Sequence, residues 1–219
     1  MFNQNKKVGE GYYYLVYDIG NGRVLKKQKR KFRFFLYILY INKTNLQGVS
    51  EYKSARRNII NIWPIYEKLV ELIPDISIIG NPIFIDGINY TQDNATQLKD
   101  VLPNKPDAES INLLEQFIKI IKELWKYGCH EKSLNFFTNF GLSRDGKVIL
   151  IDFNEITFNK TDVIADVEKM KWLNNWSYIN LPERLQHYYR KRLKEEFTVA
   201  NIEELWNSYN HSSSIKHDL

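Results

Sequence analysis

The stretch from Asn139 to Glu155, NFGLSRDGKVILIDFNE, most constrains what this 219-residue chain can fold into. An Asp-Gly pair at 145–146 separates two apolar runs, which predicts a β-hairpin. The second run, 148–151, is aliphatic throughout, as in a buried strand, and it ends next to Asp152. Asn139 and Asp152 lie thirteen positions apart on opposite arms, so the hairpin can bring both to one point.

An amide oxygen and a carboxylate that meet at a strand end are hard-ion ligands, of the kind that Mg²⁺ uses together with nucleotide phosphates. The sequence therefore predicts a metal site at Asn139 and Asp152. The alternative is an ordinary hairpin that carries a surface aspartate.

A glycine-containing segment near the N-terminus supplies a second candidate site. Gly9 and Gly11 precede a predicted strand over 12–18, and a Gly-Asn-Gly turn at 20–22 leads into a strand over 23–27. Glycine adopts positive φ and lets backbone N–H groups approach a phosphate, so both glycines are candidates for nucleotide binding. Strand alternation places Val24 and Lys26 on one face, with Leu25 and Lys27 on the other.

The order of these segments resembles the protein-kinase fold, in which a glycine loop, a strand lysine and an Asn/Asp metal pair form the ATP site. The resemblance implies that Lys26 contacts the phosphates, with Lys27 as the alternative; both could instead be solvated strand-end lysines. It also implies a carboxylate partner on the following helix, predicted over 50–73, where Glu51 is the best candidate. First-turn dipole compensation explains Glu51 nearly as well. The implied catalytic residues are Lys26, Glu51 and Asp152, and the implied cofactors are ATP and Mg²⁺.

The segment before Asn139 departs from the kinase pattern HxDxxxxN. Counting back from Asn139, Leu134 stands where the catalytic aspartate is expected, and Asn154 replaces the glycine of DFG. Three interpretations follow. The protein binds nucleotide without transferring phosphate; or Glu131, His130 or Asp166 substitutes as the base; or no base is needed, because phosphoryl transfer is mostly positioning and charge stabilisation.

Within the kinase-like proteins, the chain resembles the short bacterial PhoP-network (YrbL-type) group over residues 8 to about 175. That group is similar in length, begins with a GxG loop and also lacks the catalytic-loop aspartate. It places an acidic residue shortly after the metal-site aspartate, as Glu155 does here. The resemblance implies a fold and a nucleotide site rather than a known substrate.

The expected fold class is α+β, a minimal bilobal kinase-like fold. We expect an N-lobe over 1–92, a helical C-lobe over 93–210 that carries the metal-site hairpin, and a flexible tail over 211–219. An extended part over 76–79, 82–85 and 88–90 predicts two antiparallel strands, and a hinge-like strand and short helix are predicted over 90–102. Further helices are predicted over 110–127, with Gly128 just past its end, and over 162–172, 182–197 and 199–209.

Composition limits the remaining classes of partner. The net charge of +5 gathers at 26–33, next to an aromatic run over 32–41, and at 184–194. A run of ten residues is too short to span a bilayer. The first cluster therefore suggests a membrane surface or nucleic acid as a less favoured partner, or simple packing of the small lobe, and the second suggests the polar face of a helix. One cysteine excludes an internal disulfide, and no signal peptide is evident, so we expect a cytoplasmic protein without a transmembrane segment.

Two functions fit these expectations. The first is an ATP-dependent phosphotransferase with an atypical catalytic loop and an unknown acceptor. The second is a pseudokinase that acts as a regulatory or partner-binding module.

Overall fold

The computed structural model describes residues 6–11, 13–29, 62–173 and 176–209. The fold is α+β, as predicted, with a five-stranded antiparallel sheet and a helical part. The chain divides into two compact units, the first formed by Met1–Lys68 and Gly80–Asn94, and the second by Leu69–Ile79 and Ala95–Leu219.

The first unit contains the five-stranded sheet, in the order β1-β2-β3-β5-β4. Its strands are β1 (Lys6–Glu10), β2 (Tyr14–Gly20), β3 (Arg23–Gln28), β4 (Ile83–Phe84) and β5 (Tyr90–Asp93). Asn21 and Gly22 have φ of 52° and 75°, as the tight turn between β2 and β3 requires. The ring of Tyr90 stacks on Phe84 at 4.9 Å and meets the edge of Tyr14 at 5.5 Å.

Helix α3 (Ile62–Leu72) begins in the first unit and ends in the second. Pro64 lies in its first turn, where a missing backbone N–H is tolerated. Within the first unit, Tyr66 packs against Phe84 with ring centroids 4.5 Å apart. The earlier part of the predicted helix, 50–61, which includes Glu51, lies outside the described residues.

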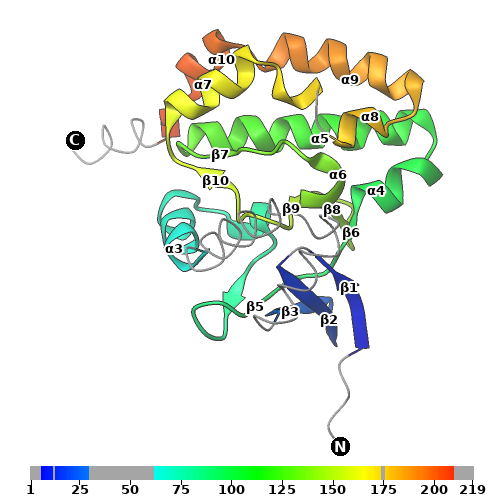
Figure 1. Cartoon of the computed structure of the whole chain (residues 1–219), viewed down its shortest axis with the longest axis vertical. Helices are drawn as coiled ribbons and strands as arrows, with labels where there is room; N and C mark the ends of the chain where they lie inside the picture. The colour runs from blue at the N-terminus through cyan, green and yellow to red at the C-terminus, as the bar shows by residue number, and fades with distance from the viewer. Residues whose placement is uncertain (1–5, 12, 30–61, 174–175, 210–219) are drawn as a thin grey trace, which may run out of the picture. The chain divides into compact units, whose positions relative to one another are not determined.

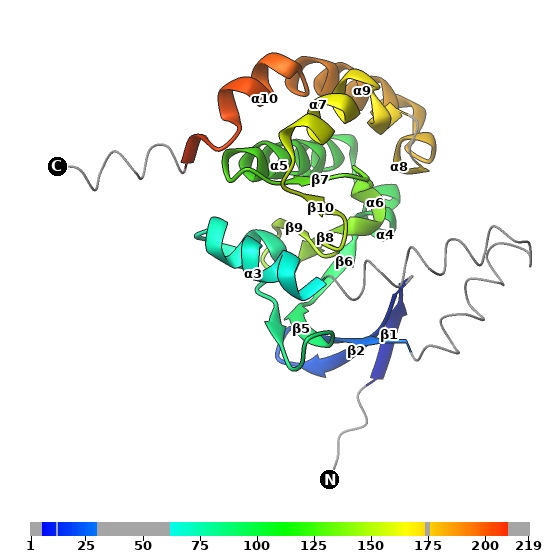
Figure 2. The same ribbon diagram turned by 60° about the vertical axis from the view of Figure 1, so that its left-hand side comes forward.

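The second unit is built around α5 (Asp107–Lys126). In both Figure 1 and Figure 2, helices α7, α9 and α10 lie on one side of α5, and the sheet β6-β8-β9 lies on the other. The remaining elements are η1 (Ile76–Ile79), β6 (Ala95–Gln97), α4 (Leu98–Val101), η2 (Leu102–Asn104), β7 (His130–Glu131), α6 (Phe136–Asn139), β8 (Phe140–Ser143), β9 (Val148–Leu150), β10 (Ile156–Thr157), α7 (Lys160–Glu168), η3 (Lys171–Leu173), α8 (Trp176–Ile179), α9 (Glu183–Glu196) and α10 (Val199–Leu205).

Helix α5 follows its sequence pattern closely. Nine of its residues are buried, including Leu114, Phe117, Ile121 and Trp125, so one long face packs against the other elements. Gly128 takes φ of 71°, and the amides of Gly128 and Cys129 bond the carbonyls of Trp125 (2.9 Å) and Leu124 (3.0 Å). This is a Schellman ending, and it confirms Gly128 as the residue just past the helix.

Two sequence predictions need correction. Residues 76–79 form a 3₁₀ helix rather than a strand. Asp75 nucleates that turn, because its carboxylate accepts the Ser77 amide at 3.0 Å, and an apolar run of four residues does not by itself distinguish the two conformations. The helix predicted over 162–172 ends earlier, at Glu168, and a separate 3₁₀ turn follows it.

The structure bears differently on the predictions for the two basic clusters. Most of the first cluster and its aromatic run lie outside the described residues. In the second, Leu185, Tyr189 and Leu193 face inward, whereas Arg190 and Lys191 are exposed, so the cluster is the polar face of α9 as predicted. Among the described residues, no helix is long and apolar enough to cross a membrane.

Candidate functional site

The hairpin brings Asn139 and Asp152 together through the main chain. Asn139 ends α6, and Asp152 follows β9 by two residues. The Asn139 carbonyl oxygen accepts hydrogen bonds from the amides of Ile151 (2.8 Å) and Asp152 (3.2 Å). One acceptor therefore ties the start of β8 to the end of β9 and holds the two predicted ligand positions next to each other.

The side chain of Asn139 has a defined orientation. Its Nδ2 atom donates to Oε1 of Glu131 (3.1 Å) and to Oγ of Ser133 (2.9 Å). Its Oδ1 atom accepts from the Thr138 hydroxyl at 3.2 Å. Because an amide oxygen has two lone pairs, this oxygen can also accept a cation.

Asp152 is half-buried, and its Oδ1 atom accepts the Asn154 amide at 3.4 Å. A second carboxylate, Glu155, follows three residues later. Burial of its carboxyl group, and then the negative charge of Asp152, raise the pKa of Glu155 above its ordinary value, although the residue as a whole is exposed. Acidic groups that repel each other in this way are stabilised by a nearby cation.

Glu131 is fully buried and is hydrogen-bonded to the Asn139 side chain. Its Oε1 atom accepts the amide of Ser133 (3.1 Å) and the hydroxyl of Ser133 (2.5 Å) as well as the Asn139 amide. Burial, only partly offset by these hydrogen bonds, raises the pKa of Glu131 to about 7. Its other oxygen, Oε2, accepts no hydrogen bond within the part of the chain that the structure describes.

The other two substitutes for a catalytic base lie elsewhere. His130 is buried, and its Nδ1 atom accepts from Nε1 of Trp125 at 3.0 Å. Burial, and then the charges of Lys171 and Lys132, lower the pKa of His130 to about 3, so the imidazole is neutral. Asp166 is buried and forms an ion pair with Lys171. Of these three residues, Glu131 accepts a hydrogen bond from the Asn139 side chain.

Leu134 occupies the position where the kinase pattern has aspartate. It is fully buried and has φ of 48°, which is unusual for a leucine. Its neighbour Asn135 starts α6, accepting the Thr138 amide at 3.4 Å. The left-handed residue therefore turns the chain from β7 into α6 and contributes a packed apolar side chain.

Ser133 is a site residue that sequence reasoning missed. It contacts Glu131 and Asn139 at once, through a single hydroxyl group. The signal for it is weak, because β7 contains only two residues and the chain between β7 and α6 has no periodicity from which a contact could be read.

The first unit holds the remaining predicted residues. Gly9 pairs with Val16, Val16 pairs with Lys26, and Lys26 pairs with Tyr90, so these residues form one row across the sheet. Directly paired residues point to the same face of an antiparallel sheet. Gly9 thus adds no side chain to the row that contains Lys26.

Lys26 and Lys27 differ in burial. Lys26 is 9% exposed, and its Nζ atom lies 5.5 Å from the centroid of the Tyr90 ring, whereas Lys27 is exposed. Burial alternates along β3 as the strand pattern predicts. Gly11 lies in the turn after β1, where its amide bonds the Tyr14 carbonyl at 2.9 Å.

The donor set fits one kind of metal site. In the described ranges, no group of three or more His, Cys, Asp or Glu side chains is arranged to hold a metal ion. Asn139 and Asp152 supply one amide oxygen and one carboxylate. Mg²⁺ is held in this manner when phosphates and water complete its shell, so the pair fits a metal that arrives with a nucleotide rather than a resident ion.

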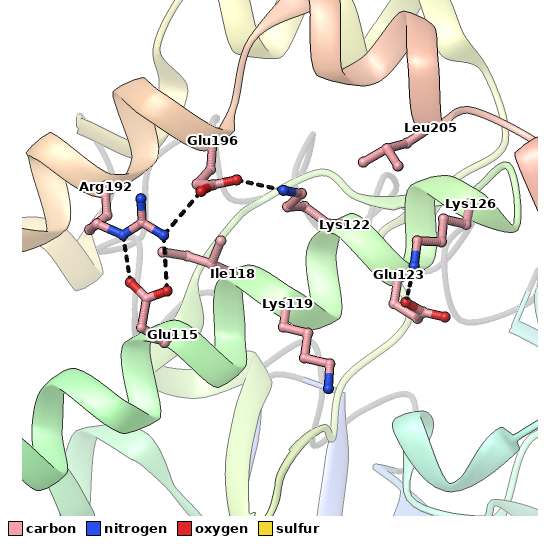
Figure 3. A pocket seen from close by; sticks show the side chains of 9 residues that line it. All are labelled: Glu115, Ile118, Lys119, Lys122, Glu123, Lys126, Arg192, Glu196 and Leu205. Atoms are coloured by element: carbon pink, nitrogen blue, oxygen red, sulfur yellow. Dashed lines mark hydrogen bonds and ion pairs between the residues drawn. The ribbon is translucent and has the colours of Figure 1, made fainter.

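A groove of about 360 Å³ is lined by residues of α5, α9 and α10 (Figure 3). Arg192 bonds Glu115 and Glu196, and Lys122 pairs with Glu196 at 2.5 Å, so the charged groups across the groove satisfy one another. Figure 3 shows Lys119 on the same helix, turned away from these pairs. These contacts, which we call the Arg192 clamp, therefore hold α5 and α9 together across the groove.

Comparison with known proteins adds little. No family model matches the chain, and none of the curated proteins matches it either. Among solved structures, the chain is similar to the one titled "The complex structure of Rv3197-erythromycin from Mycobacterium tuberculosis", with 13% sequence identity and a TM-score of 0.46. The match covers 76% of this chain and 51% of that chain, so this chain spans about half the length of that protein. A likeness this distant carries no argument about function.

Proposed function

We propose that the protein binds ATP with Mg²⁺ at a site of the protein-kinase type. Asn139 and Asp152 hold the metal, the chain at Gly9 and Gly11 lies close to the phosphates, and Lys26 contacts the α- and β-phosphates. The observation that supports this proposal is the hydrogen bond from the Asp152 amide to the Asn139 carbonyl, which brings the two residues together along the main chain.

The properties of Lys26 support its role. A buried lysine over an aromatic face is held in one conformation and is poorly hydrated, so it gains more than an exposed lysine from contact with a phosphate. Glu51 is the proposed carboxylate that orients Lys26.

Two outcomes are open once nucleotide is bound. One is phosphoryl transfer with an atypical loop, in which Lys26 and the Asn139–Asp152 pair would position the phosphates and a bound metal ion would neutralise charge. The other is a pseudokinase that regulates or binds a partner. Leu134 favours this second outcome, because a buried apolar side chain cannot accept the proton of an attacking hydroxyl.

A thermal-shift titration with ATP, with and without Mg²⁺, tests the proposal. A ligand that binds only the folded state stabilises it by about 2.7 kcal/mol at a hundredfold excess over its dissociation constant. A rise in melting temperature that requires Mg²⁺ supports the site. No rise with either ligand would contradict it and favour a partner-binding module.

An assay of ATP turnover then separates the two outcomes. Release of ADP or labelling of an acceptor identifies a phosphotransferase. Mg²⁺-dependent binding without turnover identifies the pseudokinase.

A further inference from the structure

The two ends of the Asn139 side-chain amide are chemically opposite. The oxygen can bind a cation, whereas the nitrogen carries two hydrogens and repels one. A metal site that uses Asn139 therefore depends on which end of the amide faces the ligand. The neighbours of the amide decide this orientation.

The Asn139 side-chain nitrogen donates to two neighbouring acceptors. These are Oε1 of Glu131 at 3.1 Å and Oγ of Ser133 at 2.9 Å. The Ser133 hydroxyl gives its own hydrogen to Glu131 at 2.5 Å, and its oxygen accepts from Asn139 and, at 3.3 Å, from the Asn135 amide. The three side chains form a closed ring of donors and acceptors.

The ring favours one orientation of the amide. If the amide were reversed while Glu131 is ionised, Oδ1 would face Oε1 of Glu131, and the two oxygens would repel each other. The nitrogen is therefore held on the buried side, toward the fully buried Glu131, and Oδ1 is directed away from it.

Glu131 is itself fixed by the segment that carries Asp152. It pairs with Ile156 across the β7–β10 ribbon, and the Lys132 amide bonds the Glu155 carbonyl at 3.0 Å. The segment that supplies the carboxylate thus also anchors the residue that orients the amide.

We propose that Glu131, assisted by Ser133, is a positioning residue for a metal–nucleotide ligand, and that it acts by fixing the Asn139 amide oxygen outward. This inference rests on the proposed function of the site. It assigns the buried carboxylate of Glu131 a role through hydrogen-bond geometry.

The test measures ATP affinity with and without Mg²⁺ and takes the ratio as the readout. Glu131→Met keeps the length of the side chain but removes its acceptors. We expect it to reduce the Mg²⁺-dependent gain in affinity roughly 10- to 100-fold, as loss of a residue that orients a metal ligand does. The affinity for ATP without Mg²⁺ should not change. Glu131→Gln retains an acceptor oxygen and should recover most of the gain.

A double-mutant cycle separates positioning from general damage. In an Asn139→Ala background, the amide is absent, so Glu131→Met should have no further effect on the Mg²⁺ ratio. Glu115→Gln is the matched control, because it alters another hydrogen-bonded carboxylate, in the Arg192 clamp (Figure 3), and should leave the ratio unchanged. If Glu131→Met does not fold, Ser133→Ala replaces it, since it removes one of the two acceptors of the amide nitrogen, and a smaller loss is expected.

The outcomes distinguish the inference from the function on which it rests. Full Mg²⁺ dependence in folded Glu131→Met or Ser133→Ala, or an undiminished effect of Glu131→Met in the Asn139→Ala background, overturns the positioning role alone. Absence of Mg²⁺-dependent binding in the unaltered protein overturns both.

Discussion

At the scale of single residues, neighbours of the same type differ because they lie on opposite faces of one strand. Lys26 and Lys27 are adjacent in β3, yet one is buried beside Tyr90 and the other is exposed. Both carry the same charge, so a difference between them in nucleotide binding would come from placement. The pair therefore provides an internal control.

Replacing each lysine by methionine should separate placement from charge. We expect Lys26→Met to weaken ATP binding about 10- to 100-fold, because a hydrogen bond to a charged group contributes about 1.5–3 kcal/mol. Lys27→Met should have little effect. Titration of both variants with ATP and Mg²⁺ checks this, and equal losses in the two variants would show that Lys26 does not contact the phosphates.

Asp152→Asn tests the metal ligand directly. The substitution preserves the main-chain amide that bonds Asn139 but removes the negative charge. We expect the fold to persist and the Mg²⁺-dependent stabilisation, about 2.7 kcal/mol at a hundredfold excess of ligand, to disappear. Thermal shift with and without Mg²⁺ is the measurement. A Mg²⁺-dependent shift equal to that of the unaltered protein would contradict the assignment of Asp152 as a metal ligand.

The sequence predicts part of this site. The spacing of Asn139 and Asp152 is visible because a hairpin joins them, and their contact is a main-chain hydrogen bond that depends on register. The ring with Glu131 and Ser133 depends instead on how an irregular segment turns at Leu134, with φ of 48°. A positive φ at a buried leucine runs against local preference, so no sequence rule anticipates it.

At the scale of elements, the junction of α5 with β7 determines the state of a histidine. The Schellman ending at Gly128 reverses the chain. His130 therefore lies next to Trp125, and its Nδ1 atom accepts a hydrogen bond from Nε1 of Trp125 at 3.0 Å. Because the folded protein holds this imidazole neutral, with a pKa of about 3 against an ordinary 6.5, the unfolded chain binds one more proton between those values. Stability is therefore complete above pH 6.5 and declines as the pH falls toward 3.

His130→Gln should reduce this acid sensitivity. A glutamine oxygen can still accept from Trp125, but it does not take up a proton in the unfolded chain. We expect the free energy of unfolding of the variant to fall less steeply below pH 6.5, by about 1.4 kcal/mol for each pH unit. Urea unfolding between pH 4 and pH 8 measures the slope.

His187→Gln in α9 is the matched control, because His187 is exposed. Its stability profile should follow that of the unaltered protein. Parallel profiles for all three proteins would contradict the assignment of a buried neutral His130.

The elements themselves follow the sequence where periodicity is long. Helix α5 extends over twenty residues and carries a clear apolar face, and its predicted end at Gly128 is confirmed. Short segments are less predictable. Residues 76–79 were expected as a strand and form a 3₁₀ turn, because a capping contact from Asp75 outweighs the β-branched side chains.

At the scale of the whole molecule, the fold class follows from the order of the predicted elements. Short strands come near the N-terminus, and helices come in the second half. The five-stranded sheet order β1-β2-β3-β5-β4 requires β5 to pair beside β3, and the sequence carries no sign of that adjacency. The aromatic core of the second unit is likewise distributed. The ring centroid of Phe117 in α5 lies 5.4 Å from that of Phe136 in α6 and 4.9 Å from that of Phe140 in β8.

Phe117→Ala should destabilise the second unit strongly. The ring is fully buried, and truncation of such a side chain costs about 3–5 kcal/mol, since it removes buried apolar area and leaves a cavity. Denaturant unfolding measures the loss as a shift in midpoint. Val70→Ala, at a residue that is 42% exposed in α3, is the control and should change the midpoint little. A small effect of Phe117→Ala would show that the core collapses around the gap.

The hydrogen bonds from the amides of Ile151 and Asp152 to the Asn139 carbonyl have a consequence for redesign. Since those contacts involve only backbone atoms, the spacing between the two ligand positions is independent of which side chains occupy them. Donor atoms can therefore be exchanged while the frame is kept: Asn139→Asp would make the pair doubly anionic, and Asp152→His would offer a softer nitrogen. Under the proposed function, the preference of the hairpin among metal ions would therefore depend on the two side chains at positions 139 and 152.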